Sequence, residues 1–94
     1  MTAFDLQLRP VLAPRTRLQT DPVTGEPVLL FPEGLLVLNP AAHEIVSRCD
    51  GVATIGEIIA ALAEEYDAPV DQLTADVVAC LTDLRARNLI SLAP

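Results

Sequence analysis

The stretch Val28–Pro40 reads VLLFPEGLLVLNP, two short apolar runs separated by Pro32, Glu33 and Gly34. Proline fixes one backbone dihedral and glycine adopts conformations that other residues avoid, so these residues indicate a turn between antiparallel strands. Neither run carries a charge except at the turn, and apolar residues occupy odd and even positions alike. Both faces of the hairpin are therefore hydrophobic. We expect the hairpin either to be packed under the rest of the chain or to be open to a partner chain.

A third strand is predicted before this hairpin. Residues Arg15 to Gln19 read RTRLQ, a pattern typical of a strand with one polar face, and the turn residues DPVTG follow at 21–25. Short turns between successive strands favour an antiparallel meander, so residues 15–19 and 34–38 become the two edges of the sheet. Arginines guard the first edge, whereas the second edge is bare.

The first predicted helix follows the sheet directly. Asn39-Pro40 is a helix start, because the Asn side chain accepts a free backbone N–H and proline at the first helical position sacrifices no needed donor. We expect this helix to stop at Gly51. Its predicted apolar face consists of Ala42, Ile45, Val46 and Cys49.

Two further helices are predicted. Thr54-Ile55-Gly56-Glu57 is a capping box that starts the second helix, and the third follows Pro69 and ends near Asn88, a residue type that tolerates the left-handed conformation. The predicted inward residues are Ile55, Ile58, Ile59, Leu62 and Tyr66 on the second helix, and Leu73, Val77, Leu81 and Leu84 on the third.

These elements predict an α+β fold, a winged-helix-like domain with a three-stranded antiparallel sheet followed by three helices. The single domain is expected to span residues 15–92, with Leu89 to Leu92 as a short apolar tail that closes the core. Residues 1–14 contain Pro10 and Pro14 and only a weak alternation of apolar residues. They are expected to form an extended N-terminal arm, ordered only if something packs over it.

Composition excludes several classes of partner. The chain has 94 residues, of which 51% are hydrophobic, so it supports one domain with one core. Thirteen acidic residues face six arginines and no lysine, a net charge of −7 that repels phosphate backbones and anionic membranes. The acids after residue 20 form either a solvated helix surface or a docking surface for a basic partner. Without a membrane span or signal-peptide pattern, we expect a cytoplasmic protein with no nucleic-acid or membrane partner.

Residues suited to catalysis or metal binding are scarce. His43 is the single histidine, and Cys49 lies too far along the chain to complete a local zinc set. Cys49 and Cys80 lack C-x-x-C spacing and are expected to be buried thiols. No serine lies in a G-x-S-x-G motif, and the four glycines form no phosphate loop. We therefore predict a binding protein that is not an enzyme and needs no cofactor.

The bare strand suggests where binding occurs. One shoulder of the third helix carries Thr74, Val78 and Arg85, and the other is mostly charged. If the first shoulder lies beside residues 34–38, strand and helix together make a hydrophobic groove for an extended peptide. The alternative is that Val78 only completes the core.

Several segments together resemble one family. They are RPVLAPRTRL at Arg9–Leu18, VLLFPEGLLVLNPAAHEIV at Val28–Val46, CDG at Cys49–Gly51, TIGEII at Thr54–Ile59, and L-x-x-L-x-x-x-x-L-I from Leu81 to Ile90. In this spacing they resemble the PqqD family of peptide chaperones in pyrroloquinoline quinone biosynthesis. The one departure is Asn88, where the family usually has glycine, and it concerns only a helix cap.

The resemblance implies a recognition domain for ribosomally made precursor peptides. Such a domain binds the precursor peptide PqqA and presents it to PqqE, a radical S-adenosylmethionine enzyme. The peptide is held as an added strand along the third strand, in the cleft against the third helix. The predicted groove residues of the strand are Leu36 and Leu38, or alternatively Leu35 and Val37, because a register error of one residue exchanges the two faces. From the helix the predicted residues are Val78, Leu81 and Arg85.

Two other functions fit the same fold. One is a winged-helix DNA-binding regulator, which the acidic third helix disfavours. The other is a homodimerisation module in which the bare strand pairs with its twin. A monomer or weak homodimer is compatible with the peptide-binding hypothesis.

Overall fold

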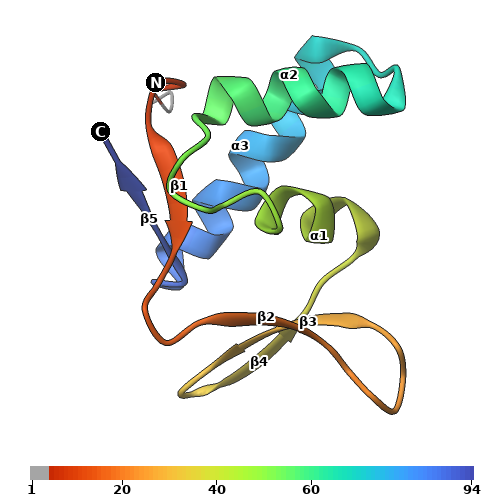
Figure 1. Cartoon of the computed structure of the whole chain (residues 1–94), viewed down its shortest axis with the longest axis vertical. Helices are drawn as coiled ribbons and strands as arrows, with labels where there is room; N and C mark the ends of the chain where they lie inside the picture. The colour runs from red at the N-terminus through yellow and green to blue at the C-terminus, as the bar shows by residue number, and fades with distance from the viewer. Residues whose placement is uncertain (1–4) are drawn as a thin grey trace.

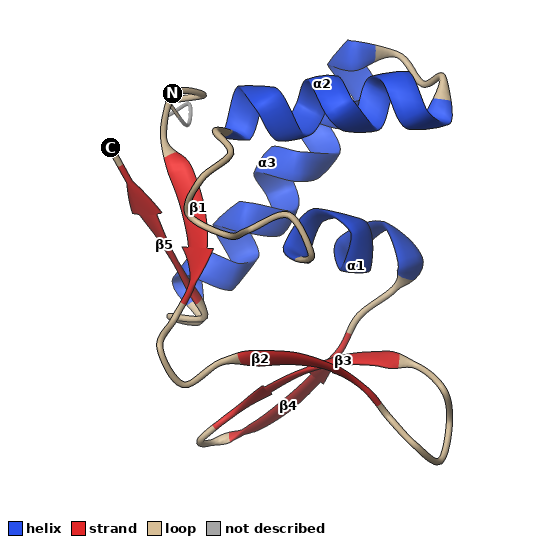
Figure 2. Ribbon diagram, in the orientation of Figure 1, coloured by secondary structure: helices blue, strands red, loops and turns tan. Residues whose placement is uncertain are grey.

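The computed structural model describes residues 5–94 and has the predicted α+β architecture, with three helices and antiparallel sheets (Figures 1 and 2). A three-stranded sheet lies at one end of the molecule and the helices lie at the other (Figure 1). Two short strands from opposite ends of the chain run along one side. The elements are β1 (Arg9–Leu12), β2 (Arg17–Thr20), β3 (Pro27–Phe31), β4 (Gly34–Val37), α1 (Pro40–Val46), α2 (Ile55–Tyr66), α3 (Val70–Ala86) and β5 (Ile90–Ala93).

The predicted meander is confirmed. Strand order is β2-β3-β4, both pairings are antiparallel, and the turn Pro32-Glu33 joins Phe31 to its partner Gly34. Leu18, Leu29 and Leu36 face one another across the three strands; Leu29 belongs to the hydrophobic core, and Leu18 and Leu36 pack against it. A slip of one residue on β4 would turn Leu36 to the other face of the sheet and bring Leu35 and Val37 to the core side.

Helix α1 starts as predicted but ends early. The Asn39 side chain accepts a hydrogen bond from the backbone N–H of Ala42 at 2.7 Å, and Pro40 is the first helical residue. The helix ends at Val46, so the predicted stop at Gly51 is wrong. The N–H groups of residues 48 and 49 reach back three residues instead of four, which tightens the backbone and ends the α-helix. Cys49 nevertheless stays buried against the core.

At the start of α2, each backbone N–H group that has no acceptor within the helix finds one elsewhere. The capping box is confirmed: the Thr54 hydroxyl accepts from the N–H of Glu57 at 3.1 Å, and the Glu57 carboxylate accepts from the N–H of Thr54 at 2.8 Å. The next two amides, of Ile55 and Gly56, donate to the backbone carbonyls of residues 8 and 6, at 2.9 Å each. The N-terminal segment therefore completes the cap that the local sequence begins.

Strands β1 and β5 form a second sheet that the sequence analysis did not predict. The chain leaves α3 through Asn88, whose φ of 61° is the left-handed conformation expected there, and the N–H of Leu89 donates to the carbonyl of Leu84. Residues 90–93 then pair with residues 9–12. The other side of β1 contacts the loop before α2, and Pro10 is fully buried. Part of the predicted arm is thus an internal strand; whether residues 15–92 fold alone stays a prediction.

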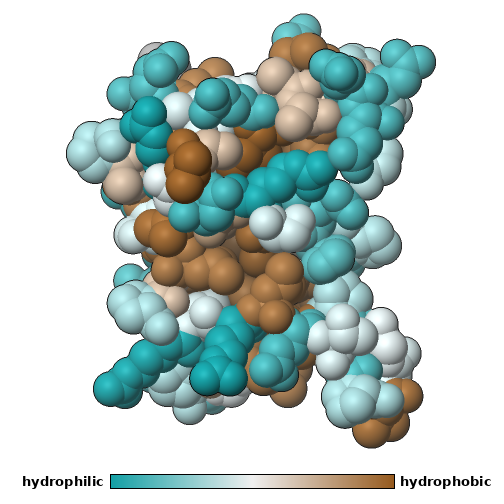
Figure 3. All heavy atoms as spheres, viewed as in Figure 1, coloured by the Kyte–Doolittle hydropathy of each residue, from teal (hydrophilic) through white to brown (hydrophobic). Residues whose placement is uncertain are grey.

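The core lies between the sheet and the helices. Leu29 and Ile55 are completely buried and join residues of all three helices. Figure 3 shows hydrophobic atoms gathered in the middle of one face, with hydrophilic atoms above and below. Among residues 5–94, no helix is long and apolar enough to cross a membrane.

Replacing the capping threonine tests this account. Thr54→Ala removes the hydroxyl that accepts from α2, and we expect it to lower the free energy of unfolding by about 1 kcal/mol. Urea denaturation measures the change. Thr82→Ala is the matched control, because that exposed hydroxyl donates only to a carbonyl within α3 and alanine favours helix. Equal stability of the Thr54 variant and the wild type would contradict the role of the cap.

Candidate functional site

Strand β4 has one open edge. In the part of the chain that the structure describes, β4 pairs only with β3. The N–H of Leu38 donates to the carbonyl of Pro27 at 2.9 Å, which fixes the phase of the ladder. Because successive residues of an antiparallel strand direct their backbone groups to alternate sides, Leu36 faces β3 and Leu35 and Val37 face outward. These two residues offer two donors and two acceptors to another chain.

The side chains of β4 divide between two faces. Leu36 and Leu38 point to the core side, where Leu38 is buried and Leu36 is half-buried. Leu35 and Val37 point to the opposite face and are 54% and 51% exposed. The structure therefore places Leu36 and Leu38 toward α3.

A groove separates β4 from α3. It has a volume of about 240 Å³ and extends from β4 to the start of α1. Its walls are mostly apolar, with one carboxylate on the helix side. The residues that line it are Leu36, Val37, Leu38, Asn39, Ala42, Cys80, Asp83 and Leu84.

The helix side of the groove differs from the predicted one. Cys80, Asp83 and Leu84 line it, and Val78, Leu81 and Arg85 do not. Leu81 is completely buried in the core. At 100° per residue, Val78 lies about 200° around the helix from Cys80, on the opposite flank. Val78, Leu81 and Arg85 are therefore not among the residues that line the groove beside β4, and a contact between them and a peptide stays a prediction.

The amino-acid sequence gives only weak evidence that the flank of α3 with Cys80 and Leu84 lines the groove. Leu73, Cys80 and Leu84 form an apolar line on α3, but charged residues interrupt it at Asp76 and Asp83. Hydrophobicity alone therefore favoured the other shoulder. Periodicity shows which residues of a helix share a flank, but the position of β4 is decided by packing across the core.

The ionisable groups at the groove are Asp83 and the thiol of Cys80. Asp83 pairs with Arg87 at 3.1 Å on the exposed surface, an arrangement that contributes little to stability. Burial, and then the negative charge of Asp83, raise the pKa of the Cys80 thiol to about 11. At neutral pH the thiol is therefore protonated and unreactive. Burial raises the pKa of Cys49 further, to about 12.

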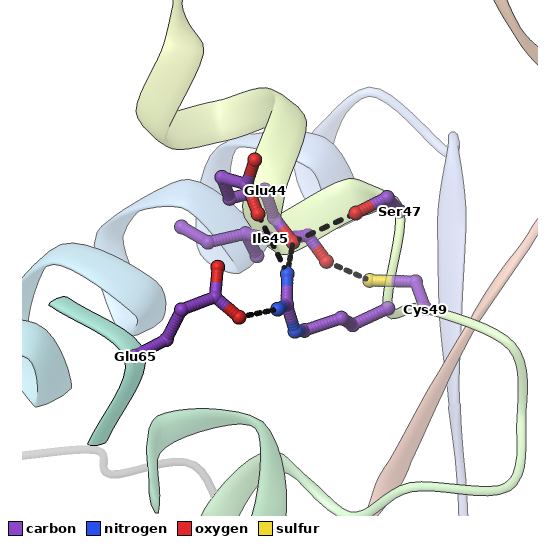
Figure 4. A network of polar contacts seen from close by, with 6 residues as sticks. Glu44, Ile45, Ser47, Cys49 and Glu65 are labelled. Carbon is purple, nitrogen blue, oxygen red and sulfur yellow. Dashed lines mark hydrogen bonds and ion pairs between the residues drawn. The ribbon is translucent and has the colours of Figure 1, made fainter. Parts of the chain in front are cut away.

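A second polar cluster connects α1 with α2. The guanidinium of Arg48 donates to the carboxylate of Glu44 and to that of Glu65, each at 2.8 Å (Figure 4). The hydrogen bond from Arg48 lowers the pKa of Glu44. Arg48 therefore links α1 to α2 through two ion pairs, and this structural role accounts for the residue. Within residues 5–94, no group of three or more His, Cys, Asp or Glu side chains is placed to hold a metal ion.

Comparisons with known proteins show the family of this chain. The family described as "Coenzyme PQQ synthesis protein D (PqqD)" matches residues 26–90, more than half of the chain. This chain belongs to the PqqD family. The resemblance found in the sequence is therefore confirmed, and it includes both walls of the groove.

Relatives and a solved structure extend the match beyond that range. A "PqqA binding protein" of Rhizobium meliloti (strain 1021) is 37% identical over 81 residues, which cover 86% of this chain and 83% of the relative. Another from Xanthomonas axonopodis pv. citri (strain 306) is 34% identical over 92 residues, covering 98% and 100%. The solution structure of the PqqD truncation of Methylobacterium extorquens PqqCD, a RiPP recognition element, has a TM-score of 0.80 at 31% identity over 96% of each chain.

The raised pKa of Cys80 gives a test of the groove environment. Alkylation by iodoacetamide requires the thiolate, so its rate at Cys80 should rise about tenfold per pH unit between pH 7 and 10. Asp83→Asn removes a charge that raises this pKa, and the variant should react faster than wild type at each pH. Mass spectrometry measures both rates, with buried Cys49 as the internal control. A rate that levels off below pH 9 would mean that the pKa of Cys80 lies below 9, and it would contradict burial of this thiol in an apolar groove.

Proposed function

We propose that this chain is a non-catalytic chaperone that binds the precursor peptide PqqA as an added strand along β4. The open edge of β4 carries the proposal, because Leu35 and Val37 direct unpaired backbone groups outward beside an apolar groove. The names of the relatives support PqqA as the peptide. Backbone pairing holds any extended chain, and the groove selects among side chains.

The magnitudes fit a reversible carrier. Four backbone hydrogen bonds at about 1 kcal/mol each give about 4 kcal/mol, half of the roughly 8 kcal/mol of a micromolar complex. Apolar side chains of the peptide must supply the rest and offset the entropy lost on association. Leu36, Cys80 and Leu84 provide the surface that would bury them. Affinity near micromolar allows later release of the peptide.

The titratable groups of the groove support a role in binding without catalysis. Its titratable groups are Asp83 and the protonated thiol of Cys80, which is unsuited to nucleophilic attack at neutral pH. The groove therefore binds a peptide without modifying it. Following the family resemblance, we propose that the radical S-adenosylmethionine enzyme PqqE supplies the chemistry and receives PqqA from this chain.

The open edge also fits a second function, pairing of β4 with its copy in a homodimer. That contact would use the same backbone groups as the peptide. Duplex DNA is a much weaker candidate, because α3 carries Asp71, Asp76 and Asp83 and the whole chain has a charge of −7.

A proline at the open edge tests strand addition. Val37→Pro removes an outward N–H without removing a donor to β3, so it should weaken PqqA binding about tenfold in calorimetry. Val37→Ala keeps the N–H and is the matched control. Leu36→Pro is unsuitable, because it removes a donor of the β3–β4 ladder. Unchanged PqqA affinity in a folded Val37→Pro variant would contradict the proposal.

Two further measurements separate the alternatives. In isotope-edited NMR, PqqA should shift the amides of Leu35 and Val37 most, and it should protect Cys80 from alkylation. Sedimentation at increasing concentration detects the homodimer. A tight dimer that PqqA does not dissociate would favour the homodimerisation module over the chaperone.

A further inference from the structure

A second hollow lies on the same flank of α3 as the groove. It has a volume of about 290 Å³ and is lined by most of α1, the end of α2 and the first half of α3. This volume is near the lower limit for ligand pockets and suits one large side chain better than a folded element. The residues that line it are Pro40, Ala41, His43, Glu44, Ile45, Leu62, Tyr66, Leu73, Asp76 and Val77.

The walls and the rim of this hollow differ in character. Ile45, Leu62 and Val77 are core residues, so the walls are apolar. The rim carries two carboxylates and no arginine. Arg48 already binds Glu44, whereas Asp76 is exposed, takes part in none of the ion pairs described above and accepts only long hydrogen bonds, of 3.4 and 3.5 Å, from the side chain of Gln72. An apolar side chain with a cationic neighbour is the ligand that matches such a site.

The hollow continues the groove. Successive turns of α3 line first the hollow, through Leu73 and Asp76, and then the groove, through Cys80 and Asp83. On α1, Ala41 lines the hollow and its neighbour in sequence lines the groove. The centres of the two sites are about seven residues apart along α3, or roughly 10 Å. About three residues of extended chain span this distance.

We infer that the peptide bound along β4 continues past Val37 and anchors a second time, placing an apolar side chain in the hollow and an adjacent Lys or Arg beside Asp76. This inference rests on the proposed function and deepens it. The chain itself follows this course, because β4 leads through Asn39 into the helix turn that lines the hollow. The hollow lies beyond Val37 for either direction of the peptide: the C-terminal end of a parallel peptide reaches it, and so does the N-terminal end of an antiparallel one. Recognition thus uses two anchors, one on each side of the first turn of α1.

Filling the hollow tests the apolar anchor. Ala41 is exposed on α1, and Ala41→Phe should occlude the hollow and weaken PqqA binding about tenfold in calorimetry. Ala61→Phe is the matched control, because Ala61 is exposed on α2 and lines neither site. Unchanged affinity of a folded Ala41→Phe variant would overturn the inference.

Charge reversal tests the cationic neighbour independently. Asp76→Arg should weaken binding severalfold at low salt, with less effect at high salt, whereas Glu64→Arg on the exposed surface of α2 should not. An alanine scan of the Lys and Arg residues of PqqA should find one substitution that abolishes the effect of Asp76→Arg. Absence of such a position would overturn the cationic contact.

These results distinguish the inference from the proposed function. If Val37→Pro weakens binding and Ala41→Phe does not, strand addition stands and the second anchor is wrong. If Ala41→Phe weakens binding and Val37→Pro does not, the hollow binds PqqA and strand addition along β4 is wrong. A loss of affinity in both variants, but not in Val37→Ala or Ala61→Phe, supports both.

Discussion

The central position of β3 is the constraint on which the structure depends. This strand pairs with β2 on one side and β4 on the other, and its middle residue, Leu29, is completely buried beneath the helices. Burial of Leu29 fixes which face of the sheet meets the core. The antiparallel ladder then fixes which backbone groups of β4 face outward. The groove between β4 and α3 follows from these two conditions together with the position of α3.

The edges of the two sheets have different surroundings. Strand β1 pairs with β5 and contacts the loop before α2 on its other side. The outer edge of β2 carries Arg17, a charged residue of the kind that discourages further pairing. On its outer edge, β4 has no neighbouring strand within residues 5–94, and none of its four residues is charged. The outer edge of β5 is likewise free of a partner strand in the described residues and uncharged, so what distinguishes the edge of β4 is that it lies beside the apolar groove.

The acidic residues near the groove and the hollow differ in whether they form ion pairs. Most acidic residues lie on solvated surfaces away from the two hollows, whereas the exposed Asp76 and Asp83 lie about two turns apart on α3 and line the hollow and the groove, respectively. Asp83 is paired with Arg87, and Glu44 with Arg48. Asp76 forms none of these ion pairs and accepts only long hydrogen bonds from the neutral side chain of Gln72. The distribution of ion pairs, more than net charge, determines where a cationic ligand is favoured.

Elements with local causes were predictable from the amino-acid sequence. The turn residues Pro32 to Gly34 predicted the hairpin and its bare strand, the caps at Asn39 and Thr54 predicted two helix starts, and Asn88 predicted a helix end, because neighbouring residues carry those signals. Family motifs predicted the identity of the ligand. Tertiary structure alone decided that β1 pairs with β5, that Cys80 rather than Val78 lines the groove, and that a second hollow adjoins it. Those features depend on the angle at which α3 crosses the sheet, which packing between distant residues sets and no local pattern encodes.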